Sequence, residues 1–257
     1  MSTTSPATTT LPDARPTRRT VTRAAAWTVP VVAVSAAAPA YAASCSALTG
    51  ASFATWSGGI SNGGLDYSQT YTPPAGAFAS SIEMKIAASY TGFIKAGSED
   101  SNGPRLYDVY NPVGNTGKPG LGLIQAVTRR MDRAAPGRSA RGAYAFSFTK
   151  PVRNLVLTFT DIDRTAGDFL DRVELSGPWV EVSRGSGVSG SGTQASPWTG
   201  GGAYSDSSSG AGNVTVRFAG PLTGFTLTYW NAETSWSGVD RNQAVFVTDV
   251  SFDYEPC

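Results

Sequence analysis

The 257-residue chain contains no histidine, only two cysteines and three methionines, and 15% charged residues. Without histidine, neither a Ser-His-Asp nor a Cys-His nucleophile can form, and His-ligated zinc, copper or iron sites are excluded. An enzyme of this composition would have to use paired carboxylates, a lysine or tyrosine base, or a Ca²⁺-assisted elimination. The absences therefore narrow the possible enzyme classes without selecting one.

The N-terminal segment has the order of an export signal. Arg18 and Arg19 form a twin arginine, and no charged residue lies between Arg23 and Asp66. The small residues around Ala42 then resemble a signal cleavage site. This order predicts a cleaved signal peptide of the twin-arginine type, and it predicts that the mature protein is extracellular or at the cell surface.

Two alternatives to this interpretation of residues 1–42 remain open. Val21 stands where twin-arginine signals more often carry Phe or Leu, which leaves the general secretory route available. Residues 24–43 are long enough to span a bilayer. However, they consist mainly of alanine with Thr, Ser and Pro and contain no Leu, Ile or Phe, so a cleaved signal is favoured and no membrane span is expected in the mature form.

The mature chain, residues 43–257, is long enough for one large β domain. Removal of the signal takes away four arginines and one aspartate, which leaves 16 basic and 18 acidic residues and a net charge of −2. A nearly neutral protein gives no electrostatic reason to bind nucleic acid. We therefore expect no nucleic-acid partner.

The two cysteines, Cys45 and Cys257, stand near the two ends of the mature chain. In an exported protein such a pair predicts a disulfide, here closing a loop that would stabilise the fold by about 4 to 5 kcal/mol in the loop-entropy description. The alternative is a lipoprotein, because the residues from Ala42 to Cys45 loosely resemble an acylation box. Acylation of Cys45 would leave Cys257 without a partner.

Short runs of alternating apolar residues recur along the chain, and each is followed within a few positions by Gly, Pro, Asn or Asp. This pattern predicts an all-β fold, an antiparallel β-sandwich of jelly-roll-like type. Pro151 falls between two of the strands and is expected to end the first. Residues 121–125 fit either a helix or a strand, and we favour the strand. The alternating runs lie at residues 82–86, 144–148, 155–159, 214–218, 225–229 and 246–252.

Two segments differ in composition from the strands. Residues 183–213 are dominated by Gly and Ser, which predicts a long excursion between strands that buries little apolar surface. Residues 129–141 contain five arginines. They are interpreted either as a solvated loop or as a contact with an anionic wall polymer.

Four aspartates, close together in the sequence after a predicted strand, are the candidate metal ligands: Asp161, Asp163, Asp168 and Asp171. Ca²⁺ prefers six to eight oxygen ligands, and an Asp-x-Asp pair at a strand end can direct several oxygens to one point. The spacing does not match an EF-hand. In the alternative interpretation, the first two aspartates cap the strand end and pair with Arg164 and Arg172.

Several segments together carry a resemblance: "FSFTKPVRNLVLTFTDID", "DRVELSG", "GSGTQASPW", "GNVTVRFAGPLTGFTLTYWN" and "AVFVTDVSFDY". Over roughly residues 140–254 the chain resembles a group of secreted bacterial surface proteins, often actinobacterial. The resemblance implies a jelly-roll-like sandwich and an extracellular location. It implies no catalytic residue.

Aromatic residues supply the candidate ligand-binding side chains, because sugar-binding sandwiches use exposed Trp or Tyr faces as stacking platforms. Trp198, Tyr204 and Trp236 lie among small polar residues and are the candidates, although a loop tryptophan can instead cover the end of a sandwich. Trp179 and Trp230 lie at the ends of alternating runs and are expected in the core.

These observations predict a secreted or cell-surface, non-catalytic β-sandwich that binds an extracellular polysaccharide or cell-wall polymer, or that contributes to adhesion. The alternative is a jelly-roll enzyme that acts on polysaccharide through carboxylates, with Ca²⁺ as a structural or catalytic ion. The absence of histidine and of a recognisable acid pair argues against the enzyme.

Overall fold

The computed structural model describes residues 48–75, 80–97, 106–127, 137–234 and 242–255, all within the unit Ala47–Cys257. The predicted signal peptide, both cysteines, Trp236 and the first three arginines of the 129–141 segment lie outside these ranges. Across the described ranges, no helix reaches the length and apolarity needed to cross a membrane.

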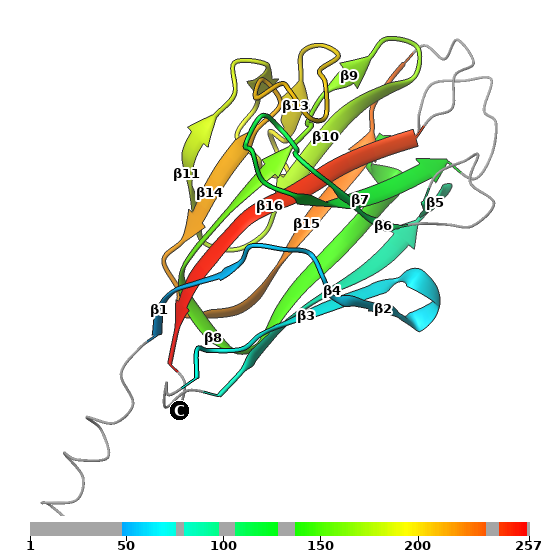
Figure 1. The fold of residues 1–257 in the computed structure, drawn as a ribbon. Helices are drawn as coiled ribbons and strands as arrows, with labels where there is room; N and C mark the ends of the chain where they lie inside the picture. Colours follow the sequence, from blue (N-terminus) through cyan, green and yellow to red (C-terminus); the bar gives the residue numbers. More distant parts are fainter. Residues whose placement is uncertain (1–47, 76–79, 98–105, 128–136, 235–241, 256–257) are drawn as a thin grey trace, which may run out of the picture. The chain divides into compact units, whose positions relative to one another are not determined.

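The described chain forms two layers of antiparallel strands, which confirms the predicted all-β sandwich (Figure 1). The first layer contains β2 (Gly59–Ser61), β3 (Asp66–Tyr71), β4 (Ile82–Thr91), the first part of β8 (Arg141–Thr160), β15 (Leu222–Asn231), β10 (Phe169–Leu175), β13 (Trp198–Gly200) and β12 (Val188–Ser189). The second contains β11 (Trp179–Arg184), β14 (Val214–Phe218), the last part of β8, β16 (Asn242–Tyr254), β1 (Leu48–Phe53), β7 (Gly120–Val127), β6 (Tyr107–Tyr110) and β5 (Ile94–Ala96). β9 (Arg164–Thr165) pairs with β10, and two short 3₁₀ turns are η1 (Asn62–Gly64) and η2 (Gly137–Ser139).

Strand β8 belongs to both layers. Residues 141–148 pair with β4 and β15, whereas residues 152–160 pair with β14 and β16, apart from Val152, which also lies opposite Leu222 of β15. The change of partners falls at Pro151, which has no N–H to contribute to a ladder. The predicted strand end at this proline is therefore a transfer of one continuous strand from one layer to the other.

The same transfer changes which residues of β8 face the core. Tyr144 and Phe148, at even positions, are buried in the first part, whereas Leu155 and Phe159, at odd positions, are buried in the second. Asn154, with a left-handed φ of 47°, lies between Val152 and Leu155, which are both buried, and shifts the alternation by one residue. Both halves thereby direct their apolar side chains into the same core.

Aromatic side chains join the two layers. The rings of Phe218 and Phe225 stack at 4.8 Å between centroids, and those of Phe148 and Phe252 lie 5.9 Å apart. The apolar residues that define the six predicted alternating runs are all buried. Residues 121–125 belong to strand β7, as favoured. The hydrophobic pattern thus defines most of this core.

The Gly/Ser-rich segment, residues 183–213, differs from its prediction. It contains β12 and β13, and β13 pairs with β10, which extends the first layer. Trp198 in β13 is completely buried. The segment is packed against the sandwich because one large aromatic side chain and a series of backbone hydrogen bonds replace the many small apolar contacts that its composition lacks.

Candidate functional site

Three of the four predicted aspartates lie on the turn between β8 and β10, and the fourth, Asp171, lies in β10. Asp161 follows the last residue of β8 and has a left-handed φ of 67°, which is unusual for a residue other than glycine. Asp163 and Asp168 are 5% and 4% exposed, and Asp171 in β10 is completely buried. The turn therefore directs most of its acidic side chains inward and not to solvent.

Asp171 is the end of a hydrogen-bonded chain that crosses the core. Tyr144 donates to Gln125 Oε1 at 3.3 Å, Gln125 Nε2 donates to Gln243 Oε1 at 3.1 Å, and Gln243 Nε2 donates to Asp171 Oδ1 at 2.7 Å. The other Asp171 oxygen accepts the peptide N–H of Asp163 at 3.1 Å. Both oxygens of this buried carboxyl therefore have partners, as buried polar groups require.

Asp163 and Asp168 are held by the backbone around them. Asp163 Oδ2 accepts the peptide N–H of Tyr204 at 3.1 Å, and the Asp168 carbonyl accepts Asn231 Nδ2 at 3.0 Å. Arg164, a predicted partner, instead lies 3.4 Å from Glu233. In the described ranges no ion pair joins Asp161 or Asp163 to an arginine, so the ion-paired turn is not the arrangement of these two residues.

Burial and mutual repulsion shift the acidity of these groups. Burial, followed by the proximity of Asp163, Asp206 and Asp171, raises the pKa of Asp161 to about 9. Burial also raises the pKa of Asp163 to about 6, although the hydrogen bond from Tyr204 opposes it. For Asp171, burial raises the pKa well above its ordinary value. Without a cation, the turn holds carboxyl protons at pH values where exposed aspartates are ionised.

The metal prediction stays a prediction. Among the residues that the structure describes, no group of three or more acidic or cysteine side chains is arranged to hold a metal ion. Asp171 is bonded within the core, away from a shared point with the other three.

The predicted aromatic candidates lie in different surroundings. Trp198 packs between Trp179, at 4.9 Å, and Phe159, at 6.4 Å, and its Nε1 donates to Glu181 at 3.2 Å. The ring of Trp198 is completely buried and belongs to the hydrophobic core. Tyr204 is half-buried, and Trp236 lies outside the described residues.

A pocket that the sequence did not indicate lies beside β3 and β6. Its volume is about 340 Å³, and three aromatic side chains, Trp56, Tyr67 and Tyr107, form much of its wall. The ring of Tyr67 lies 6.0 Å from that of Trp56 and 5.6 Å from that of Tyr107. Two apolar side chains, Ile60 at 56% exposure and Val109 at 45%, line it from the surface.

The polar ends of these aromatic side chains are bonded inside the protein. Tyr67 donates to Gln69 Oε1 at 2.7 Å, and Tyr107 donates to the Leu65 carbonyl at 2.9 Å. Trp56 Nε1 donates to the Pro119 carbonyl at 3.1 Å. The three rings are therefore fixed in place, and since Trp56, Tyr67 and Tyr107 are 7%, 2% and 4% exposed, only small parts of their hydrocarbon surface face the pocket.

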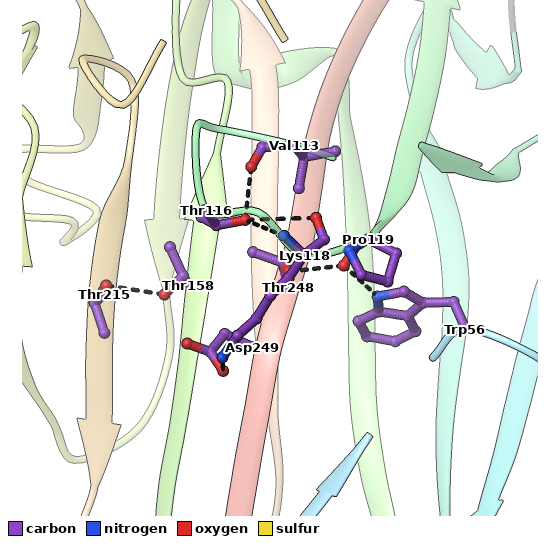
Figure 2. Close-up of polar contacts among 9 residues, drawn as sticks. All are labelled: Trp56, Val113, Thr116, Lys118, Pro119, Thr158, Thr215, Thr248 and Asp249. Carbon is purple, nitrogen blue, oxygen red and sulfur yellow. Dashed lines mark hydrogen bonds and ion pairs between the residues drawn. The ribbon is translucent and has the colours of Figure 1, made fainter. Parts of the chain in front are cut away.

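The segment that holds Trp56 is anchored to the second layer. Figure 2 shows the Pro119 carbonyl accepting from both Trp56 and Thr248 Oγ1, the latter at 2.7 Å. In the same view Lys118 pairs with Asp249, and Thr116 Oγ1 bonds within the loop. One wall of the pocket is thus positioned from strand β16.

The sequence did not reveal this pocket, because the residues that line it lie far apart along the chain. Trp56, Tyr67 and Tyr107 belong to three separate segments, and none stands in a recognisable motif. The exposed Ile60 and Val109 are the only local signal, and single exposed apolar residues are common on protein surfaces. Comparison of the chain with known protein families and with curated proteins finds no match.

Proposed function

We propose that this protein is an exported, non-catalytic β-sandwich that binds a sugar unit of an extracellular polysaccharide or cell-wall polymer in the pocket formed by Trp56, Tyr67 and Tyr107. The observation that carries the proposal is this rigid aromatic wall with an open apolar rim. Aromatic faces stack against the C–H faces of sugar rings, and a preformed wall loses little entropy on binding.

The composition of the pocket supports binding over hydrolysis. Glycoside hydrolysis requires two carboxyl groups about 5 to 9.5 Å apart. Asp108 is the only acidic residue in the described lining of the pocket. One carboxylate can accept hydrogen bonds from sugar hydroxyls. The described lining contains no second carboxyl group that could act as the catalytic acid or the nucleophile.

The extracellular location is part of the proposal and rests on the sequence. The twin arginine, the uncharged segment and the small residues before Ala43 support export, and the resemblance over residues 140–254 supports a surface role. An exported binding protein would meet polysaccharide rather than nucleic acid, in keeping with its near-neutral charge.

Binding can be tested with a matched pair of variants. The wild type is assayed by calorimetry with soluble oligosaccharides from wall polysaccharides and by sedimentation with the insoluble polymers. Val109→Asp places a charge on the pocket rim, and Val182→Asp places one on β11, where Val182 is 58% exposed. We expect Val109→Asp to weaken binding about tenfold or more, because the charge must be desolvated, and Val182→Asp to bind like the wild type. Equal binding by both variants, or no binding by the wild type, contradicts the proposal.

The carboxylate enzyme is the second candidate, and one observation favours it. Asp161 and Asp163 have raised pKa values of about 9 and about 6, which is a property of catalytic acids and bases. Release of reducing ends from the same polymers by the wild type, with loss in Asp163→Asn, would establish the enzyme. Absence of release while binding persists would leave the binding protein.

A further inference from the structure

Two buried polar atoms in the described chain have no hydrogen-bond partner: Thr160 Oγ1 and Asn213 Oδ1. Thr160 is the last residue of β8 and is completely buried. Asn213 precedes β14, and the pairing of Val214 with Phe159 places Asn213 opposite Thr160. The two residues that carry the unsatisfied oxygens therefore lie opposite each other, although leaving such groups buried costs about 1 to 3 kcal/mol each.

The two side chains converge on one glycine. A Cβ at Gly114 would lie 2.5 Å from Thr160 Cγ2 and 2.6 Å from Asn213 Oδ1. Asn213 Nδ2 donates to the Gly114 carbonyl at 2.7 Å, and the Gly114 N–H donates to the Asp206 carbonyl at 2.6 Å. Thr160, Asn213 and the backbone of Asp206 thus meet around the same residue.

Two acidic residues, Asp161 and Asp206, stand next to this cluster of groups. Asp161 directly follows Thr160 and has a left-handed φ of 67°. In the described ranges its side chain has neither a hydrogen bond nor an ion pair. Asp206 is exposed and interacts electrostatically with Asp161. Like charges in one place are unfavourable unless a cation offsets them.

From this arrangement we infer a site for one hard divalent cation, Ca²⁺, formed by Thr160 Oγ1, Asn213 Oδ1 and the carboxylates of Asp161 and Asp206. All four donors are oxygens, the ligand type that Ca²⁺ takes in flexible geometry, with water completing the coordination. Two carboxylates with two neutral oxygens also agree with the absence of a three-carboxylate group in the described chain.

This site differs from the one predicted from sequence. Asp163, Asp168 and Asp171 leave the ligand set, and Asp206, Asn213 and Thr160 enter it. A cation there would connect the end of β8, the Gly/Ser-rich segment and the loop around Gly114, which are otherwise joined by a few backbone hydrogen bonds. The inference is independent of the aromatic pocket and of the proposed sugar binding.

The test is thermal unfolding of the mature protein at pH 7.5 in EDTA and in CaCl₂, with isothermal titration by CaCl₂ alone. We expect Ca²⁺ to raise the melting temperature of the wild type by about 5 to 10 °C when it exceeds its Kd a hundredfold. Asp206→Asn, a surface change that leaves the core intact, should lose most of this rise. Glu83→Gln, which removes a carboxylate from β4, should keep it.

The variant Thr160→Val tests whether Thr160 is a ligand of the cation or only a residue of the core. Without Ca²⁺, removal of an unpaired buried hydroxyl should leave the melting temperature unchanged or raise it. With Ca²⁺, the same variant should show a smaller rise than the wild type, whereas Thr228→Val, at a buried threonine of β15, should show the full rise. No shift in the wild type, or equal shifts in Asp206→Asn, Thr160→Val and the wild type, overturns the inference.

Discussion

At the scale of single residues, Asp171 is the clearest departure from ordinary behaviour. Its carboxyl is completely buried in β10 and accepts hydrogen bonds from Gln243 and from the Asp163 peptide. These two donors favour the ionised form, but burial outweighs them and raises the pKa well above its ordinary value. The residue is therefore a source of pH-dependent stability.

The sign of that dependence follows from linkage. A carboxyl whose folded pKa exceeds its unfolded value, about 3.9, stabilises the fold fully below that unfolded value and loses this contribution as the pH rises through the folded pKa. Asp171→Asn cannot ionise. We expect the free energy of unfolding of the wild type, measured by urea denaturation relative to that of Asp171→Asn, to fall by about 1.4 kcal/mol for each pH unit between the unfolded and the folded pKa. A difference between the two proteins that is constant, or that moves in favour of the wild type as the pH rises, contradicts this.

At the scale of elements, β8 and β13 show what sequence patterns can and cannot reveal. The alternation of residues 144–148 and 155–159 correctly predicted strand structure in both stretches, because period-2 burial is a local property. It did not reveal that both belong to one strand shared by two layers, because the shift at Asn154 is visible only from the partners on either side.

The Gly/Ser-rich segment shows the opposite error. Composition predicted little burial over residues 183–213, yet β13 carries Trp198 into the core. A single large ring can bury as much surface as several small side chains, but a residue count gives it no more weight than one small residue. Similarly, the four aspartates located the acidic turn in the sequence. The neutral oxygens of Thr160 and Asn213 could not be located in this way, because Thr160 ends β8 and Asn213 precedes β14.

Trp198 therefore gives a prediction at the scale of its element. We expect Trp198→Ala to lower the free energy of unfolding by about 3 to 5 kcal/mol, because it empties a fully buried site next to Trp179. A surface tryptophan would change it by less than about 0.5 kcal/mol. Chemical denaturation followed by circular dichroism measures the difference, with Val182→Ala on exposed β11 as the control. A near-neutral Trp198→Ala would show that the segment is not part of the core.

At the scale of the whole molecule, the two layers are joined covalently through β8 and by aromatic contacts such as Phe148 with Phe252. Neither layer has a core of its own, so we expect them to unfold in one transition.

The first and last described strands are also neighbours, since β1 pairs with β16 and Leu48 lies opposite Tyr254.

This register bears on the two cysteines. Cys45 and Cys257 each stand three positions beyond Leu48 and Tyr254 in the sequence, and the bridge between them stays a prediction. If they are bridged, reduction under native conditions should lower the melting temperature by several degrees, because about 1 kcal/mol corresponds to some 2 to 4 °C in a domain of this size. An unchanged midpoint, or a diacylglycerol adduct on Cys45 by mass spectrometry, would contradict the bridge.

The neighbouring positions of Leu48 and Tyr254 also determine how the protein would respond to mechanical force. Tension applied between these residues acts across one rung of the β1–β16 ladder, so the hydrogen bonds break one after another and the strands peel apart under a small load. Strands pulled from opposite ends would instead share the load over every rung. A covalent link between the two ends would carry the tension and leave the sandwich unstretched.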